Sequence, residues 1–419
     1  MAKARRTGGL LRQATRRDAR ALAELWVRAF PDERTVDDRV RQLESRALYG
    51  GIDDCWMLER AGHLVAGCRL YPFRQFLAGA ELPMLGLGAV AVAPQARRQG
   101  IGAALCRDAL RIGRERGDVV SALYPFRPDF YRALGWGYVG TLLGFRFAAR
   151  ALESDAELVA GVRLAGQDDR PAIERCFARV AERSHGPIRR PAGAWDAHLA
   201  APTDVVLHED AGTLRGYLLV QRGRQRVAAD RTLTVRELVA EGAVAYRALL
   251  GWIGAQADQW PQITYEARPD ECFDLRLRDP RPPRFRPSRR RLWDPVARAL
   301  RGPMLRVLDV PRALESRAWG AAPDSGFRAR IEVRDRELPE NAGPWAVEVG
   351  AGVARVVQGP CDAADASLIV EPATFAQIWA GEMAPSTACR LGSAQVEDPE
   401  RLLDAAFAVS QSFWLPDAF

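Results

Sequence analysis

The sequence is poor in the residues that build metal sites and disulfide frameworks. Only 7 of its 419 residues are cysteine and only 4 are histidine. No C-x-x-C pair occurs, and no histidine lies at ligand spacing from a cysteine. Both a structural zinc site and a disulfide framework need regularly spaced ligands or cysteines, so neither is expected. Scattered free cysteines are typical of a reducing compartment, which predicts a cytoplasmic protein without a bound metal.

Long apolar runs are also missing. No run of eighteen apolar residues occurs, which predicts no transmembrane helix and no membrane partner. The basic first nine residues are followed by no apolar stretch, so we expect a frayed tail and no secretory signal. Nearly all cations are arginine, and a net charge of +7 is modest for this length. That charge permits contact with anions but does not by itself indicate nucleic acid.

The most informative stretch is a basic turn between an apolar strand over 89–93 and an amphipathic helix. The turn over 97–102 reads RRQGIG. Two glycines two apart let the backbone approach a ligand closely. Amides at a helix N-terminus, with two arginines beside them, favour an anion. The stretch therefore predicts a diphosphate site, with a basic structural turn as the alternative.

Spacing separates this turn from other phosphate-binding motifs. A Walker loop needs G-x-x-x-x-G-K-[ST], and no lysine follows Gly102. A dinucleotide fingerprint needs glycine or alanine where Leu105 stands. The order strand, proline, R-x-x-G-x-G and helix resembles instead the acyl-CoA pyrophosphate loop of the GNAT acetyltransferases.

A chain of this length is too long for one core, and the patterning predicts three α/β or α+β domains. Helical spacing and strand-like alternation divide residues 10–150 into one α/β domain. The helices predicted there, besides the one after the turn, cover 18–30, 35–48 (with Thr35 as N-cap) and 128–134. The other predicted strands cover 55–59, 63–73, 119–124 and 138–148.

Residues 151–323 repeat this alternation. The predicted helices cover 170–183 and 244–256, and the predicted strands cover 205–208, 216–221 and 233–239. The turn at 240–242 (AEG) has no R-x-x-G-x-G and no basic pair. A second copy of the fold would therefore lack the phosphate loop, and one cofactor site per chain is expected.

The rest of the chain divides into an arginine-rich segment and a small domain. The segment 279–291 (DPRPPRFRPSRRR) is interpreted as a solvated connection, with a nucleic-acid or phosphate patch as the alternative. Residues 324–419 form a compact α+β domain. Its predicted strands cover 328–333, 346–349, 353–357 and 366–370, and its predicted helices cover 374–380 and 401–408.

Four separated motifs together resemble one family. They are GAVAVAP at 88–94 with RRQG at 97–100, YPFRPDFYRALGWGY at 124–138, MLRVLDVPRALESR at 304–317, and LDAAF at 403–407 with the final Phe419. From about residue 10 onward, the chain resembles the Eis-type ("enhanced intracellular survival") GNAT N-acetyltransferases. The resemblance implies an active GNAT domain, a second GNAT-like domain without cofactor, and a domain shaped like a sterol carrier protein. It also implies a homo-oligomer, a hexamer in this family.

The resemblance further implies acetyl-CoA as co-substrate and assigns its contacts. One strand amide, near Val90, would face the thioester oxygen, as in an oxyanion hole. The implied cofactor-binding residues are Val90, Ala91, Val92, Arg97, Arg98, Gln99, Gly100, Ile101, Gly102, Ala103, Phe126 and Arg127. The last two depart from the small or acidic residues common in the family at those positions.

Two residues are implied in catalysis. Tyr131 would protonate the leaving thiolate, and a phenol with a pKa near 10 is well matched to a thiol near 8.5. The alternative is a core tyrosine, and Tyr124 and Tyr138 are interpreted as packing residues. The resemblance also implies that the carboxylate of Phe419 accepts the proton of the amine. An apolar chain end (SFWLPDAF) must bury, which would carry this carboxylate inward. The alternative is a terminus that packs on its own domain.

Other residues are candidates for the acceptor pocket. Asp417 is an acid that could help to hold a cationic acceptor. Trp26, Phe30 and Trp56 are candidates to line the pocket, with core packing as the alternative. No serine or cysteine with a neighbouring histidine is visible, which argues against a covalent mechanism.

These observations predict an acetyl-CoA-dependent N-acetyltransferase that acts directly on a primary amine. The acceptor would be a small molecule or peptide amine, such as an aminoglycoside, a polyamine or a lysine-like group. The alternative is a non-catalytic protein that binds acetyl-CoA and holds an apolar ligand in its sterol-carrier-like domain. A third hypothesis, nucleic-acid binding through the arginine-rich segment, is not favoured.

Overall fold

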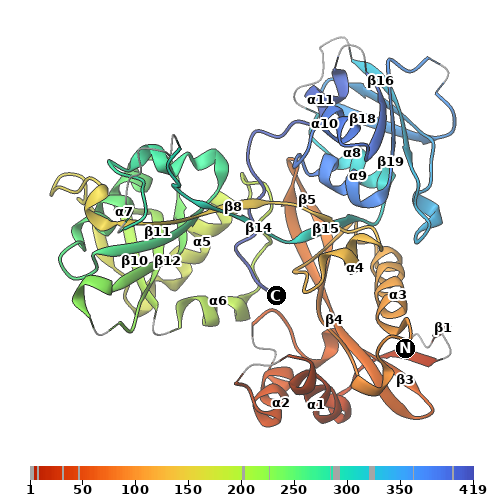
Figure 1. The fold of residues 1–419 in the computed structure, drawn as a ribbon, viewed down its shortest axis with the longest axis horizontal. Coiled ribbons are helices and arrows are strands. Elements are labelled where there is room, and N and C mark those ends of the chain that lie inside the picture. Colours follow the sequence, from red (N-terminus) through yellow and green to blue (C-terminus); the bar gives the residue numbers. More distant parts are fainter. Residues whose placement is uncertain are drawn as a thin grey trace. The chain divides into compact units, whose positions relative to one another are not determined.

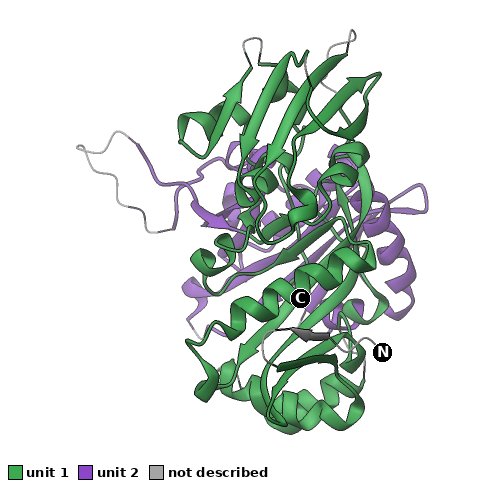
Figure 2. Ribbon diagram, turned by 90° about the vertical axis from the view of Figure 1, so that its right-hand side faces the viewer, with its two compact units in different colours: residues 1–139, 185–194, 302–419 green, residues 140–184, 195–301 purple. Residues whose placement is uncertain are grey.

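The computed structural model describes residues 4–6, 9–30, 33–45, 48–200, 203–225, 227–283, 285, 293–319, 326–361, 363–398 and 401–419. They form two compact units, coloured separately in Figure 2. Unit 1 combines Met1–Val139, His185–Ala194 and Gly302–Phe419, and unit 2 combines Gly140–Ser184 and Trp195–Arg301. Parts of the predicted N-terminal tail and of the arginine-rich segment lie outside the described residues.

An eight-stranded sheet forms the N-terminal part of unit 1 (Figure 1). Its order is β1-β2-β3-β4-β5-β6-β15-β7. The strands are β1 Ala4–Arg6, β2 Gly9–Gln13, β3 Cys55–Arg60, β4 His63–Leu77, β5 Ala80–Val92, β6 Val120–Leu123, β15 Met304–Val307 and β7 Gly137–Tyr138. The strands β4 and β5 form a long antiparallel hairpin, and β5 pairs with β6 in parallel.

Helices cover both faces of this sheet. They are α1 Ala19–Ala29, α2 Val36–Glu44, α3 Ile101–Arg116 and α4 Pro128–Arg132. The helix α1 contacts β4 where Leu22 meets Gly67, and α3 contacts β5 where Gly113 meets Leu85. The predicted cap of α2 is confirmed, because the Thr35 hydroxyl accepts the N–H of Asp38 at 3.2 Å.

The strand predicted over 138–148 is wrong as a single element. It is broken at Gly140, whose φ of +80° interrupts the extended backbone. The first piece, β7, belongs to the eight-stranded sheet, and the second piece, β8 Thr141–Ala148, belongs to unit 2. The place beside β6 is taken instead by β15, which pairs antiparallel with both β6 and β7.

Unit 2 contains a seven-stranded sheet in the order β14-β8-β13-β12-β11-β10-β9. The further strands are β9 Val162–Leu164, β10 Thr203–Asp210, β11 Thr213–Arg222, β12 Thr232–Ala240, β13 Gln262–Ala267 and β14 Arg298–Arg301. The helices α5 Arg170–Ala181 and α7 Ala243–Ala255 agree with the prediction, whereas α6 Ala192–Leu199 was not predicted. As in unit 1, two adjacent central strands, β12 and β13, pair in parallel over a short stretch.

A five-stranded sheet with the order β18-β17-β16-β19-β20 forms the C-terminal part of unit 1. Its strands are β16 Phe327–Val333, β17 Trp345–Gly350, β18 Val353–Gln358, β19 Ala366–Val370 and β20 Ala394–Glu397. The helices are α8 Val310–Ser316, α9 Pro372–Trp379, α10 Pro385–Arg390 and α11 Leu402–Phe407. Large buried side chains, among them Trp319 and Trp379, fill its core. Across the described ranges, every helix is too short or too polar to span a membrane.

Candidate active site

The strands β5 and β6 separate in the middle of the eight-stranded sheet. They pair only from Met84 to Gly86, opposite Val120 to Ala122, while β5 continues to Val92. On the side facing β6, no other described strand pairs with residues 87–92. An open strand edge of this kind presents backbone donors and acceptors to an extended ligand. This gap contains Val90, Ala91 and Val92, the predicted strand contacts of the cofactor.

A β-bulge lies in this free part of β5. Ala89 and Val90 together face one residue of β4, Cys68, because the register shifts between Gly67 and Arg69. Ala89 has a φ of +49°, and its carbonyl accepts the indole N–H of Trp26 at 2.8 Å. A bulge redirects the backbone groups beside it. Trp26 is 2 % exposed and therefore belongs to the core, where it supports the bulge.

The basic turn lies directly after β5. Gly100 forms the N-cap of α3 with a φ of +74°, a conformation that favours glycine. The N–H of Ala104 makes the first helical bond, to the Gly100 carbonyl, which leaves the preceding amides without helical acceptors. Arg97 donates to the Val92 carbonyl at 3.2 Å, and the side chains of Arg98 and Gln99 are exposed. The turn and the open edge of β5 are thus joined and fit an extended ligand that ends in a diphosphate.

Tyr131 is buried in α4 beneath aromatic neighbours. It is 2 % exposed, and its ring meets those of Phe130 and Trp136 edge-on at 5.0 and 6.0 Å. Burial raises the pKa of Tyr131 well above its usual value, and the thiols of Cys106 and Cys68 raise it further. Cys68, the residue opposite the bulge, belongs to the same hydrophobic core as Tyr131. At neutral pH this phenol keeps its proton.

The two predicted contacts before α4 are at the surface. Phe126 is 65 % exposed, and its ring meets that of Tyr131 edge-on at 5.8 Å. Arg127 forms an exposed ion pair with Asp129 at 3.0 Å. Both contact Tyr131, Phe126 through its ring and Arg127 through its carbonyl, which accepts the Tyr131 N–H at 3.4 Å. The Arg127 guanidinium is bound within its own turn.

Phe419 packs on the strands β4 and β5, so this end of the chain is ordered. Its ring packs edge-on against four aromatic rings, those of Tyr49, Tyr71, Phe73 and Tyr124, with centroids 4.9 to 6.2 Å away. A Cβ added at Gly86 would lie 3.0 Å from this ring. A Cβ added at Gly88 would lie 3.6 Å from one oxygen of the Phe419 carboxyl group. The two glycines therefore leave room for the chain end. They place its carboxyl group beside Gly88, one residue before the bulge.

Asp417 is held by other residues. Its side chain is fully buried and accepts the Arg190 Nε at 2.7 Å and the Tyr49 hydroxyl at 2.9 Å. The hydroxyl of Tyr124 lies 3.0 Å from the Asp417 carbonyl oxygen and 3.1 Å from that of Leu415. Asp417 therefore secures the chain end. Its carboxylate is bound by Arg190 and Tyr49 and is buried away from an amine substrate. Tyr124, interpreted as a packing residue, anchors the same segment.

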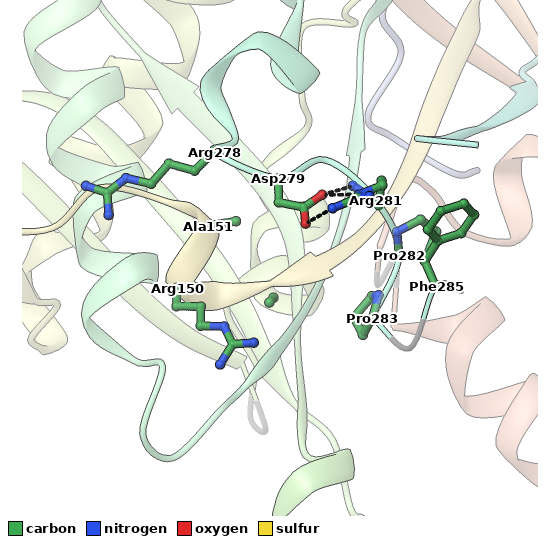
Figure 3. Close-up of a pocket in the computed structure, with 9 residues that line it drawn as sticks. Arg150, Ala151, Arg278, Asp279, Arg281, Pro282, Pro283 and Phe285 are labelled. Atoms are coloured by element: carbon green, nitrogen blue, oxygen red, sulfur yellow. Dashed lines mark hydrogen bonds and ion pairs between the residues drawn. The ribbon is translucent and has the colours of Figure 1, made fainter. Parts of the chain in front are cut away.

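The arginine-rich segment contributes to a hollow of about 360 Å3 in unit 2 (Figure 3). Its lining residues include Arg150, Arg278, Arg281 and Phe285. In Figure 3 the Arg281 guanidinium points to Asp279, which it binds at 2.8 and 2.9 Å. It also lies over the Phe285 ring at 5.7 Å. Arg281 is thus neutralised locally, while residues 284 and 286–292 lie outside the described part.

Comparisons with known proteins agree with this architecture. Acetyltransferase (GNAT) domain profiles match residues 11–139 and 186–307, and a sterol carrier protein domain profile matches residues 310–416. The N-acetyltransferase Eis of Mycobacterium tuberculosis (strain ATCC 25177 / H37Ra) is 30 % identical over 369 residues, which cover 83 % of this chain and 84 % of that protein.

Solved structures share the whole fold. A GCN5-related N-acetyltransferase from Anabaena variabilis matches with a TM-score of 0.82 at 20 % identity, over 98 % of this chain and 99 % of that chain. Eis1 from Mycobacterium abscessus matches with a TM-score of 0.78 at 22 % identity, over 98 % and 100 %. The chain is therefore an N-acetyltransferase of the GNAT class. Within that class it belongs to the Eis-type family, with two GNAT domains followed by a sterol-carrier-like domain.

Proposed function

We propose that this N-acetyltransferase transfers an acetyl group from acetyl-CoA directly to a primary amine. Tyr131 is the general acid in this proposal, and the carboxylate of Phe419 is the proton acceptor. The observation that carries it is the position of the Phe419 carboxyl group beside Gly88, directly before the bulge in β5. A carboxylate and the open edge of β5 meet there.

The residues that would hold acetyl-CoA lie along one path. GNAT acetyltransferases use acetyl-CoA, and the open edge of β5 would bind its extended arm through Val90, Ala91 and Val92. The turn would hold the diphosphate by the amides of Ile101, Gly102 and Ala103, assisted by the cations of Arg97 and Arg98. Gln99 and Gly100 shape the turn between them.

Each group in the proposed mechanism has one task. The amine nitrogen attacks the thioester carbon, the new C–N bond forms, and the C–S bond breaks. The Val90 amide donates to the carbonyl oxygen while charge develops there. The carboxylate of Phe419 takes the ammonium proton, and Tyr131 donates its proton to the leaving thiolate.

The acceptor follows from the charge of the base. An ammonium group has a pKa near 10 and a terminal carboxylate a pKa near 3.5, so the carboxylate is a weak base toward it. It works by attracting and orienting the cation and by taking its proton, and the free amine then attacks the thioester carbon. This chemistry suits aminoglycosides, polyamines and lysine-like amines.

Thiol release with a panel of these amines tests the proposal. Tyr131→Phe should lower kcat about a hundredfold with little change in the KM for acetyl-CoA, because the proton donor acts only on the leaving group. Deleting Phe419 should lower kcat at least as much. Tyr138→Phe is the matched control and should keep its turnover. Turnover that survives both changes contradicts the assignment, and tight acetyl-CoA binding without thiol release for any amine supports the non-catalytic alternative.

A further inference from the structure

The segment His185–Ala194 joins unit 1, although the residues around it in the sequence belong to unit 2. It pairs along the end of β4. The Phe76 N–H donates to the Pro187 carbonyl at 2.9 Å, the Gly186 N–H donates to the Phe76 carbonyl at 2.7 Å, and Ile188 bridges Gln75. We call residues 185–190 the strap. It adds an isolated antiparallel bridge to the long hairpin on which Phe419 lies.

The strap also binds the end of the chain, between Trp414 and Asp417. The Trp414 N–H donates to the His185 carbonyl at 2.8 Å. Gly186 has a φ of +118°, and a Cβ there would lie 2.6 Å from the Trp414 carbonyl oxygen, so only glycine allows this approach. At the other end of the strap, Arg190 meets Asp417. The strap and the chain end therefore run together from Trp414 to Asp417.

The ion pair between Arg190 and Asp417 is enclosed on all sides. Both side chains have no exposed surface, and the Nε–Oδ1 distance is 2.7 Å. Tyr49 donates to the same Asp417 oxygen, and its ring also meets that of Phe419. The Tyr124 hydroxyl donates to the backbone carbonyl of Asp417, and the Tyr124 ring also meets that of Phe419. The two tyrosines thus couple the position of Asp417 to that of Phe419.

We propose that Arg190 and Asp417 are positioning residues that fix where the Phe419 carboxylate stands beside Gly88. This inference rests on the proposed function. Chain ends normally fray, and a base displaced by about 1 Å can cost a hundredfold in rate. Asp417 is two residues from the carboxylate, so holding it removes most of the freedom of the chain end.

Energetics favour positioning over stability as the role of this pair. A buried ion pair is weak evidence for stability, because desolvation of both charges offsets their attraction. Replacing both partners by apolar residues of similar volume is often neutral for folding. A buried polar pair two residues from the proposed base is therefore better explained by orientation. Through Arg190, the strap then orients the chain end that carries the proposed base.

The test separates positioning from folding by changing both partners together. In the variant Arg190→Met/Asp417→Leu, we expect a melting temperature lowered by only a few degrees, because the Tyr49 hydroxyl loses its acceptor. We also expect an unchanged KM for acetyl-CoA and a kcat about a hundredfold lower. Arg189→Met is the matched control, because Arg189 lies next to Arg190 but forms an exposed ion pair with Glu81 at 2.8 Å. It should keep its turnover. Should the double variant not fold, Asp417→Asn keeps the shape of the carboxylate and Arg190→Lys keeps the positive charge. The kcat should fall in Asp417→Asn, and it should be higher in Arg190→Lys than in Arg190→Met.

A combination with the Phe419 deletion distinguishes the two proposals. If Arg190 and Asp417 act through the carboxylate, the double substitution has no further effect once Phe419 is deleted. Wild-type turnover in the double variant, with an inactive Phe419 deletion, overturns the positioning role and leaves the proposed function intact. If the double substitution lowers kcat by the same factor with and without Phe419, the positioning role is overturned as well. Wild-type turnover in the deletion itself overturns the proposed function.

Discussion

His185 shows at the scale of one residue how the strap is held. It is buried, its Nδ1 accepts the Ala78 N–H at 3.0 Å, and its Nε2 lies 2.9 Å from the Ala380 carbonyl oxygen. Together these bonds need a neutral ring with the proton on Nε2. Burial, helped by the positive charge of Arg317, lowers the pKa of His185 to about 4. The sequence carries no motif around this histidine, so its role was not predictable.

This lowered pKa predicts acid sensitivity. The unfolded chain binds the proton near pH 6.5 and the folded chain only near pH 4, so stability is complete above pH 6.5 and falls as the pH drops toward 4. The loss from this residue approaches roughly 3 kcal/mol. Urea unfolding at pH 7 and pH 4.5 should show a smaller pH effect for His185→Gln, which keeps a donor and an acceptor. An equal pH effect in the variant would contradict the assignment.

The catalytic candidates differ in how far the sequence could predict their surroundings. The motif around Tyr131 suggested both its role and its alternative, and the structure adds its burial and its aromatic neighbours. The composition of the chain end predicted that Phe419 would be buried. No local sequence pattern predicts the roles of Arg190 and Tyr49, because each meets Asp417 across more than two hundred residues of sequence.

At the scale of elements, β5 carries most of the proposed site. Its alternating glycines, Gly86 and Gly88, point to the face that holds Phe419, while Leu85 points to α3 on the other face. Small residues repeated every second position in a strand indicate a close approach by another segment. The G-L-G pattern therefore indicates that another segment packs closely here, but it does not identify that segment as the chain end with Phe419.

An added methyl group at Gly86 should disturb the chain end. Its Cβ would lie 2.7 Å from the Phe73 ring and 3.0 Å from the Phe419 ring, so one of the two must move. We expect Gly86→Ala to lower kcat about tenfold or more, by displacing the proposed base. Gly350→Ala in β17 is the control, because a methyl group there meets open space. Equal kinetics for the two variants would show that Phe419 is not held by this close contact.

Some elements could not be predicted because their partners are distant in the sequence. Most helices of the chain follow local apolar spacing and agree with prediction within a few residues. The strand β15 was recognised only as part of a motif, since its pairing with β6 depends on residues far earlier in the chain. The break at Gly140 was missed because 138–148 reads as one continuous apolar strand.

At the scale of the whole molecule, unit 1 is assembled from three separate stretches. Its sheet needs β15, and its candidate active site contains the strap and the chain end. The predicted domain boundaries at 150 and 323 stay predictions, as do the hexamer and the cytoplasmic location. The resemblance gave the order of the domains correctly, because that order is carried by local motifs.

A fragment of residues 1–150 should therefore not fold into a stable domain. Without β15, the paired edge of β6 is lost, and Leu305 no longer fills the core beside Ala122. We expect weak near-ultraviolet circular dichroism and no cooperative thermal transition for this fragment, with a cooperative transition in the full chain. A soluble fragment that melts cooperatively would show that the first 150 residues contain a complete core.

The late position of β15 in the chain has a consequence for synthesis. Residues 140–301 must leave the ribosome before β15 can enter the sheet between β6 and β7. At usual bacterial or eukaryotic elongation rates this takes roughly 10 to 30 seconds. During that interval the edge of β6 stays open to wrong partners, a known cause of aggregation. Fast folding of the central unit would shorten this exposure.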